Sequence, residues 1–373
     1  MKVYLAIDIY NPNLGGASEW VRELSIWLTE RGYRVSILCE RADAPIPSGC
    51  QLRSPRVSEW KPCPWQRALR LQRLVGRQPD GLVHDTGYLL GSDIFHPLMG
   101  SRMHNEFRQM RAFPPLRALV HLHGSKLWQV ARMQWRQMRK SRYLVACSQR
   151  VVKDFAQLGR VAHQVIRNGI AAPLDYPAEA VVRLRSELGA TGRRLVLLTS
   201  NNHYLKGVPN LLRALTLLSP EARSELMVVV AGHNREPELQ RFVEANRLGD
   251  CCLLAGWVED IGPYYQAADI FFHPTHHDAG SLSTMKALAA GCAVATSRWD
   301  GSSELIQAGQ NGLVLESPRD SRQLASVLTR LLDRELTERM GLEARRLMPA
   351  LAQERGFEQV EQLYRSLRET TAP

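Results

Sequence analysis

Two loops of this sequence carry residue types that bind anionic groups. The pair Gly15-Gly16 lies between a predicted buried strand and a predicted helix, where backbone N–H groups and the helix N-terminus can approach an anionic or sugar group. Lys206, in the run Leu205-Lys206-Gly207, also stands at a predicted helix start, where an ammonium can neutralise phosphate beside the helix dipole. Each loop has a structural alternative, because a tight turn also needs two glycines and an isolated lysine is commonly only solvated.

A third polar loop follows a predicted buried strand that ends at His273. Gly280, Ser281 and Leu282 stand at the start of the next predicted helix, which is a ready anion site, and Asp278 is available for sugar hydroxyls. A loop that merely caps this helix would have the same composition. The three histidines of the loop match no zinc spacing, so we expect no metal.

A fourth polar run, Asp300-Gly301-Ser302-Ser303-Glu304-Leu305, leads into a predicted helix over residues 302–308. Ser302 or Ser303 could simply cap this helix, and Glu304 could simply favour its dipole. Ligands of open parallel sheets bind beyond the carboxyl ends of the strands, and all four loops follow predicted strands.

The elements that must position these loops alternate between strand and helix. Buried strands over 2–9 and 34–39 flank a helix over 18–30, which is a βαβ unit of parallel sheet. After the midpoint we predict strands over 194–199, 226–231, 252–255, 270–273, 293–297 and 313–315, with helices over 208–218, 237–246, 281–290, 302–308, 320–332, 336–347 and 353–367. At 373 residues the chain is too long for one ordinary domain. We therefore expect an α/β protein with two Rossmann-like doubly wound domains, 1–168 and 169–345, and a C-terminal helix within 346–373 that packs back on the first domain.

The formal charge of +11 is concentrated in the first part of the chain. Residues 1–165 hold 25 Lys and Arg against 12 Asp and Glu, whereas the remainder holds 23 against 25. In the densest stretch, Glu106 alone opposes Arg102, Arg108, Arg111, Arg117, Lys126, Arg132, Arg136, Arg139, Lys140 and Arg142. The apolar residues among these charges are Leu127, Trp128, Val130, Met133, Trp135 and Met138. This pattern suits an anionic membrane interface, although a solvated basic face or core packing would use the same residues.

The cysteine pattern and the hydropathy of the chain predict the cellular compartment of the protein. The seven cysteines are scattered and form no CxxC pair, which is typical of a reducing compartment. No apolar stretch approaches the roughly 18 residues of a membrane span, and the first ten residues do not have the pattern of a signal peptide. We expect a cytoplasmic protein that is peripheral on the inner membrane.

The motifs occur in a fixed order over nearly the whole chain. They are Gly15-Gly16, Val145-Ala146-Cys147-Ser148, Ile166-Arg167-Asn168-Gly169-Ile170, Lys206-Gly207-Val208 with Leu211-Leu212-Arg213-Ala214, Ala231-Gly232, the stretch from Asp278 to Lys286, and Gly301 to Glu304. This combination resembles glycosyltransferase family 4. Within that family, His273-Pro274-Thr275, Ser281-Leu282 and the loop Ser200-Asn201-Asn202 resemble the bacterial enzymes that build the lipopolysaccharide core.

The resemblance implies a GT-B fold, in which two Rossmann-like domains face a cleft and hold the nucleotide-sugar donor mainly by the second domain and the acceptor by the first. It implies transfer of a hexose from a UDP-linked donor to a phosphorylated glycolipid, such as a lipopolysaccharide core, with retention of configuration and no metal cofactor. The sequence contains no DxD, the metal-binding motif of other glycosyltransferases. A basic first domain suits a phosphorylated glycolipid at an anionic inner-membrane surface.

The resemblance also implies roles for the loops. Lys206 would stabilise the leaving diphosphate, where negative charge develops. The backbone around Gly15, Gly16, Gly280, Ser281 and Leu282 would donate N–H groups to the phosphate and sugar of the donor, and Asp278, in the place of the family's first acidic residue, would contact sugar hydroxyls.

His96 resembles a family histidine near the reacting sugar. It follows a predicted strand in the run Asp93-Ile94-Phe95-His96. An ordinary loop histidine is the alternative, because other histidines lie nearby in the sequence, namely His84, His104, His121 and His123.

Two positions depart from the family pattern. Lys286 stands where the family has a second Glu that holds the nucleotide ribose, and a cation cannot accept hydrogen bonds from ribose hydroxyls. Asn201 stands where the family often has an Arg, so one charge partner of the donor diphosphate is missing.

Three interpretations of Lys286 follow. Glu304 could pair with Lys286 or take over the ribose contact, or Lys286 could bind an additional anionic group of an unusual donor. In the third interpretation donor binding has decayed, and the protein is a non-catalytic GT-B protein at the membrane. An epimerase on the same fold fits the motifs less well, and nucleic-acid binding lacks any recognisable module.

Overall fold

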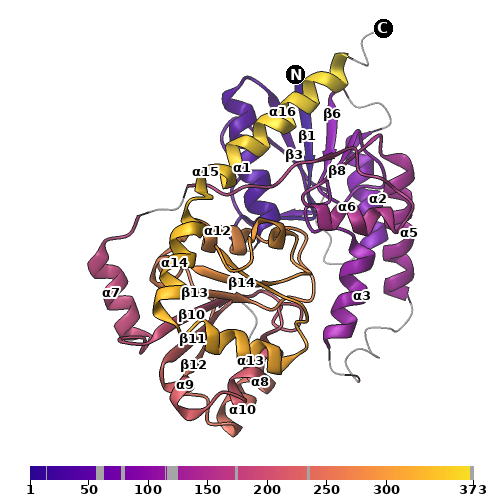
Figure 1. Ribbon diagram of the computed structural model, residues 1–373. Coiled ribbons are helices and arrows are strands. Elements are labelled where there is room, and N and C mark those ends of the chain that lie inside the picture. The colour runs from indigo at the N-terminus through magenta and orange to yellow at the C-terminus, as the bar shows by residue number, and fades with distance from the viewer. Residues whose placement is uncertain are drawn as a thin grey trace. The chain divides into compact units, whose positions relative to one another are not determined.

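The computed structural model describes residues 1–13, 15–55, 63–76, 80–113, 115, 125–172, 175–232 and 236–369 (Figure 1). The chain divides into two compact units. Unit 1 comprises Met1–Met110, Pro115–Asn168 and Gln353–Pro373, and unit 2 comprises Arg111–Pro114 and Gly169–Ala352. The C-terminal segment of unit 1 therefore begins at Gln353 and not at residue 346, because residues 346–352 belong to unit 2.

Unit 1 is built on a parallel sheet of seven strands in the order β5-β3-β1-β6-β7-β8-β9. The strands are β1 (Lys2–Ala6), β3 (Arg34–Leu38), β5 (Gln51–Arg53), β6 (Leu82–Asp85), β7 (Ile94–Phe95), β8 (Tyr143–Ala146) and β9 (Gln164–Val165), and β2 (Ile9–Tyr10) pairs separately with β4 (Arg41–Ala42). The helices are α1 (Gly16–Glu30), α2 (Pro64–Val75), α3 (Arg102–Ala112), α5 (Ser125–Lys140), α6 (Gln149–Ala156) and α16 (Gln353–Glu369).

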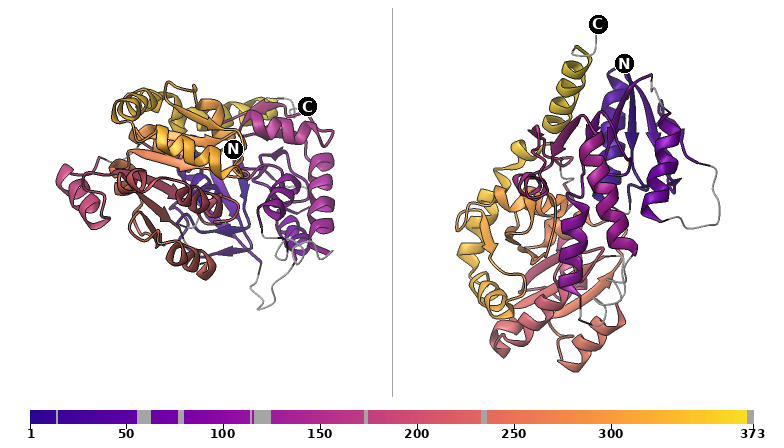
Figure 2. Two further views of the ribbon diagram at one scale, coloured as in Figure 1. Left: turned by 60° about the horizontal axis from the view of Figure 1, so that its bottom comes forward. Right: turned by 90° about the vertical axis from the view of Figure 1, so that its right-hand side faces the viewer.

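Both faces of this sheet are covered, which explains the continuous apolar run of β1. Val3 and Leu5 belong to the core that α1 and α16 share with the sheet, whereas Tyr4 and Ala6 pack with α2 on the opposite face. Figures 1 and 2 show α16 running along this unit, far in sequence from the strands it covers. Alternate side chains of one strand therefore supply two separate cores.

Unit 2 repeats this architecture with a parallel sheet of six strands in the order β12-β11-β10-β13-β14-β15. The strands are β10 (Arg194–Thr199), β11 (Leu226–Ala231), β12 (Cys252–Gly256), β13 (Ile270–His273), β14 (Ala293–Ser297) and β15 (Gly312–Leu315). The helices are α7 (Ala178–Glu187), α8 (Val208–Thr216), α9 (Pro220–Ser224), α10 (Pro237–Ala245), α11 (Gly262–Ala267), α12 (Leu282–Ala290), α13 (Ser321–Arg330), α14 (Arg334–Arg345) and α15 (Met348–Leu351). Val196 and Leu198 face α8, α10 and α13, whereas Leu195 and Leu197 face α11 and α12. The fold is therefore GT-B, as the sequence predicts.

The segment after β14 differs from its prediction. The expected α-helix over 302–308 is a short 3-10 helix, η1 (Gly301–Leu305). Asp300 caps it by accepting a hydrogen bond from the Ser302 amide at 2.8 Å, and the amides of Ser303 and Ile306 bond carbonyls three residues back. The tight winding thus follows from a cap that a buried side chain holds in place. Among the described helices, none is long and apolar enough to cross a membrane.

The C-terminal helix is held in unit 1 by a buried polar contact as well as by its apolar face. The hydroxyl of Tyr364 lies 2.6 Å from His84 Nδ1, and both side chains are fully buried. In a partly buried contact of the same helix, the hydroxyl of Tyr33 donates to Glu361, which Arg365 also contacts.

We predict that Tyr364→Phe lowers the free energy of unfolding by about 1–3 kcal/mol, because His84 Nδ1 loses its partner inside the core. Tyr33→Phe is the matched control and costs less than about 1 kcal/mol, since Glu361 keeps its arginine partner. Urea unfolding of the full chain measures both changes. Equal losses of unfolding free energy in the two variants would show that the buried hydrogen bond of Tyr364 stabilises the chain no more than that of Tyr33.

Candidate active site

Three neighbouring strands of unit 2 end at one edge of the sheet, and the expected polar loops follow them there. The strands are β10, β13 and β14. The first two loops are bound directly to each other, since the His276 amide and the Thr275 hydroxyl donate to the carbonyl of Leu205 at 2.7 and 3.1 Å. These hydrogen bonds fix the backbone on either side of the residues that carry charge.

Lys206 and Asp278 meet at this edge. The ammonium of Lys206 forms an ion pair with Asp278 Oδ2, and the two side chains are 21% and 17% exposed. The pair is thus partly withdrawn from water yet open to a ligand. Two residues that lie 72 positions apart in the sequence are brought into contact at the start of α8.

The glycine that follows Lys206 is required by the backbone. Gly207 caps α8 in the left-handed conformation with φ of 77°, and a Cβ there would lie 2.0 Å from the carbonyl oxygen of Pro274. Any other residue would separate the two loops. The glycine therefore keeps Lys206 beside the positive end of α8 and within reach of the Asp278 loop.

Asp300 is the buried centre of this region. Its Oδ2 accepts from the hydroxyls of Thr284 and Thr296 at 2.7 and 2.8 Å, and its Oδ1 accepts from the amides of Ser302 and Ser281 at 2.8 and 3.3 Å. Burial alone would raise the pKa of this carboxyl, but the hydrogen bond and charge attraction of His273 and the other donors lower it to about 2. The sequence predicts no role for Asp300, because its only signal is a carboxylate among threonines and serines after a buried strand.

The start of α12 is only in part the anion site that the sequence predicts. Ser281 caps the helix by accepting from the Thr284 amide at 3.1 Å, but its own amide donates to Asp300 and the Gly280 amide donates weakly to Asp278 at 3.4 Å. Within the described part of the chain, the amide of Leu282 donates to no acceptor. The Ser283 amide likewise donates to no acceptor there, so the amide donors left for an anionic ligand are those of Leu282 and Ser283.

Lys286 and Glu304 lie on two elements that touch. Lys286 is half-buried on α12, and Glu304 is exposed in η1. Asn201 is exposed in the loop after β10. Their contacts with a donor stay predictions.

In unit 1, Gly15 caps α1 with an extended backbone. A Cβ at this position would meet no atom within 4 Å, so packing of the described residues does not require glycine there. The amides of Ser18 and Glu19 bond to the Gly15 carbonyl, and Gly16 begins the helix. The open space beside the pair is available for a ligand at the start of α1.

His96 lies in the core of unit 1 and has 0% exposure. Its Nδ1 is 3.2 Å from His84 Nε2, the two rings stack with centroids 5.3 Å apart, and Trp20 packs edge-on against both. Among the described residues its Nε2 has no hydrogen-bond partner. Burial lowers the pKa of His96 to about 3 and the pKa of His84 well below its usual value, so both are neutral. His104 contacts Ser101 and Gln157, and the other competitors, at 121 and 123, lie outside the described residues.

No group of three or more His, Cys, Asp or Glu side chains in the described ranges could hold a metal ion. His276 lies 3.0 Å from the Asn210 amide nitrogen, and burial lowers its pKa to about 4. The histidines of this loop are therefore part of the interior of unit 2.

The apolar residues of α5, within the basic stretch, lie on two faces of the helix. Val130 and Met133 are buried, and Met133 packs with α2, as expected for a core. Trp128 and Trp135 are 73% and 56% exposed and share a helix face with Arg132 and Arg139. Not every arginine of the stretch is solvated, since Arg108 contacts the buried Asp154 at 3.7 Å.

The chain is similar to known proteins over both units. Residues 14–172 match the model of Glycosyltransferase Family 4, and residues 193–334 match the model of Glycosyl transferases group 1. The lipopolysaccharide core biosynthesis mannosyltransferase LpcC of Rhizobium leguminosarum bv. viciae is 28% identical over 214 residues. That match covers 56% of this chain and 60% of LpcC, which is less than two thirds of its length.

Two solved structures share the fold. The crystal structure of WaaG, a glycosyltransferase involved in lipopolysaccharide biosynthesis, matches with a TM-score of 0.81 and 18% identity over 97% of this chain and 99% of that one. Anabaena HepE in complex with UDP and glucose matches with a TM-score of 0.71 and 17% identity over 98% and 100%. At these identities the likeness is one of fold.

The buried histidines of unit 1 predict a pH dependence of stability. Below about pH 6.5 the unfolded chain protonates His84 and His96, whereas the folded chain does not. The free energy of unfolding therefore falls as the pH drops from 6.5 towards 3, on the order of 1 kcal/mol per pH unit for each histidine. Denaturant unfolding at pH 7, 6, 5 and 4 should give a smaller pH slope for His96→Gln than for the wild type. Identical slopes would mean that His96 is not buried in its neutral form.

Proposed function

We propose that this chain, which has the GT-B fold and resembles enzymes of lipopolysaccharide core biosynthesis, is a glycosyltransferase that transfers a hexose from a UDP-linked sugar to a phosphorylated glycolipid. The proposed reaction retains the anomeric configuration and uses no metal. The observation that carries the proposal is the ion pair of Lys206 with Asp278 beside the start of α8. The similarity to LpcC and WaaG, which act in lipopolysaccharide biosynthesis, supports the acceptor class, and the UDP complex of HepE supports the nucleotide.

In this proposal Lys206 binds the diphosphate of the donor. Negative charge builds up on the diphosphate as the sugar departs, and a fixed cation next to a helix N-terminus stabilises that charge more in the transition state than in the ground state. Arrival of the diphosphate releases Asp278, which can then accept hydrogen bonds from hydroxyls of the transferred sugar. The amide of Leu282 provides a further N–H donor in unit 2. The donor-binding role of Gly15 and Gly16 stays a prediction of the family resemblance.

The ribose contact is assigned to Glu304 in place of the family's second Glu. Glu304 lies in η1, which touches the helix that carries Lys286, and its carboxylate can accept from ribose hydroxyls. If Glu304→Gln leaves donor affinity unchanged, this assignment is wrong.

We predict that one UDP-sugar raises the melting temperature of the purified chain and that Lys206→Ala weakens this donor by about 10- to 100-fold, since it removes a charge-assisted contact. A donor at 100 times its dissociation constant adds about 2.7 kcal/mol, which a thermal shift resolves. Arg298→Ala is the control, because this exposed cation of unit 2 pairs with Glu316. Equal weakening in both variants would reflect general charge and not a diphosphate site.

Lys286→Glu decides between the catalytic and the non-catalytic interpretation. A donor that stabilises the wild type shows that Lys286 is compatible with donor binding and identifies the donor in the same panel. If no donor binds the wild type but a UDP-sugar stabilises Lys286→Glu, the chain is a degenerate GT-B protein and the proposed reaction fails.

We further propose a cytoplasmic location with peripheral binding to the anionic inner membrane through the outer face of α5. Trp128 and Trp135 are suited to the headgroup region, and Arg132 and Arg139 between and beside them attract anionic lipid. Such a site would bring the enzyme to a lipid-linked acceptor.

The expected result is sedimentation with vesicles of phosphatidylglycerol at low salt and not with neutral vesicles. The double variant Trp128→Ala/Trp135→Ala should bind at least about tenfold more weakly, because two large aromatic side chains leave the interface. Trp257→Ala, which removes an exposed tryptophan of unit 2, is the control. Undiminished binding of the double variant would contradict this membrane face.

A further inference from the structure

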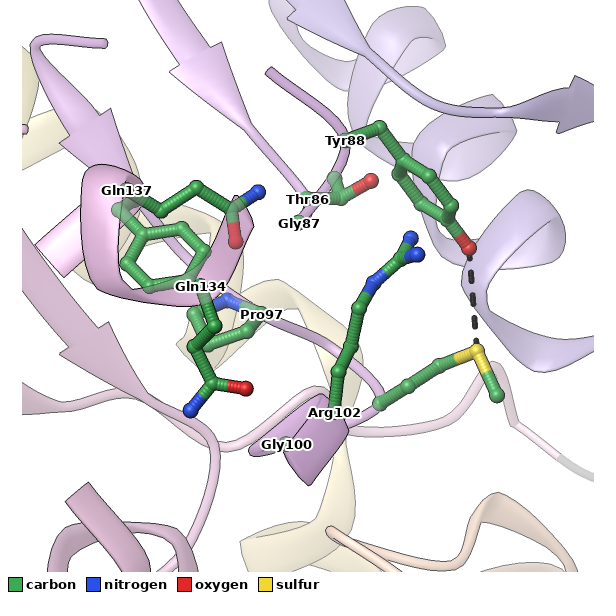
Figure 3. Close-up of a pocket in the computed structure, with 10 residues that line it drawn as sticks. Thr86, Gly87, Tyr88, Pro97, Gly100, Arg102, Gln134 and Gln137 are labelled. Atoms are coloured by element: carbon green, nitrogen blue, oxygen red, sulfur yellow. Dashed lines mark hydrogen bonds between the residues drawn. The ribbon is translucent and has the colours of Figure 1, made fainter. Parts of the chain in front are cut away.

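A small pocket of unit 1 combines a cation with buried amides at the carboxyl ends of two strands. Its lining includes Thr86 and Pro97, which follow β6 and β7, and Arg102, Gln134 and Gln137 from α3 and α5 (Figure 3). We propose that this pocket receives one oxygen of a phosphate or carboxylate group of the acceptor, with Arg102 as its donor. The inference rests on the proposed function, because it deepens the acceptor side of that reaction.

The guanidinium of Arg102 is fixed in position by an aromatic ring, but no described carboxylate pairs with it. It lies over the ring of Tyr88, 4.4 Å from the centroid, and Figure 3 shows it between that ring and the two glutamines. Within the described residues it forms no hydrogen bond and no ion pair within 4.0 Å. Arginine presents planar N–H donors that match phosphate and carboxylate oxygens, and stacking on an aromatic ring fixes its orientation.

The buried carboxylate of Asp85 interacts with this cation through its charge, but no hydrogen bond joins the two side chains. Asp85 is fully buried, and its Oδ1 accepts from the amides of Gly87, Tyr88 and Leu89 at 2.6 to 3.0 Å. Burial raises the pKa of Asp85 to about 6, although these amides and the charge of Arg102 oppose the rise. Asp85 thus shapes the loop after β6, and the donors of Arg102 remain available to a ligand.

Two buried glutamines give the pocket a fixed wall. The Gln134 side chain accepts from the Met103 amide at 2.9 Å and donates to Ser101 at 2.9 Å, which ties the first turn of α3. The Gln137 amide donates to the Leu89 carbonyl at 2.7 Å and so ties the loop after β6. Both side chains are 1% exposed. Arg102 is therefore presented from a rigid helix start, where the helix dipole adds to its positive potential.

The size of the pocket limits what enters it. Its cavity volume is about 10 Å³, which is the space of one water-sized group. A sugar ring cannot enter, whereas a single oxygen of an anionic substituent can, with the rest of the ligand outside. The pocket therefore distinguishes acceptors by a charged substituent and not by the sugar that carries it.

The test compares Arg102→Gln with Arg136→Gln, which removes an exposed cation of α5 outside the pocket. Melting of the full chain is followed with methyl phosphate, with acetate and with sodium chloride at equal ionic strength. We expect methyl phosphate or acetate to stabilise the wild type and Arg136→Gln, and Arg102→Gln to lose at least about 80% of that shift, because the lining offers no second cation. The two anions distinguish a phosphate from a carboxylate.

Several results would overturn the proposal. The proposal fails if neither anion stabilises the wild type, or if all three proteins show an equal shift in melting temperature. It also fails if both variants lose this shift equally, which would indicate a diffuse basic surface. If Arg102→Gln does not fold, Arg102→Lys replaces it and should weaken the anion by about tenfold, since it keeps charge but loses the planar donors. Donor binding is measured in the same samples with the UDP-sugar panel. If no UDP-sugar binds the wild type, the proposed function fails. If a UDP-sugar binds but the anion-induced shift does not depend on Arg102, only this inference fails.

Discussion

The buried carboxylate of Asp300 is the constraint on which the site of unit 2 depends. It accepts hydrogen bonds from the cap of α12, from β14 and from η1, and its main chain pairs with Asp278 in an isolated parallel bridge. A buried acceptor that satisfies several donors at once is costly to remove, because each donor would lose its partner in a region without water. The loops after β13 and β14 therefore hold one arrangement before any ligand arrives.

The two units use charge in opposite ways. Unit 1 keeps neutral groups inside, where burial lowers the pKa of His84 and His96, and it keeps the tryptophans and arginines of α5 outside. Unit 2 places opposite charges at the edge of its sheet, partly exposed and paired. A protein with this distribution offers a broad positive surface on one unit and a local, compensated charge site on the other.

Sequence patterns predicted β10, β11 and β13 of unit 2 well because each is a largely apolar run buried on both faces. They failed at η1, whose winding depends on the buried Asp300. They also could not place His96, whose partner His84 is bonded in turn to Tyr364 of the last helix. Because those contacts join residues that are far apart in the sequence, the local spacing of residues cannot predict them. The apolar residues of α5 were found by composition, but only the packing of α2 shows which of them face inward.

The pairing of Lys206 with Asp278 links the donor-binding and sugar-binding roles in the proposed function. An ammonium that is partly withdrawn from water needs a counter-charge, and Asp278 supplies it in the chain without a ligand. A diphosphate carries more negative charge than one carboxylate and is also attracted by the positive end of the α8 dipole, so it is the stronger partner for the same lysine. Once Lys206 is displaced, Asp278 Oδ2 is available to accept from a sugar hydroxyl, while Oδ1 keeps its weak bond from the Gly280 amide. In the proposed function, one ion pair would thus couple recognition of the nucleotide to recognition of the group it carries. The close fit of Gly207 against Pro274 keeps Lys206 and Asp278 within reach of each other.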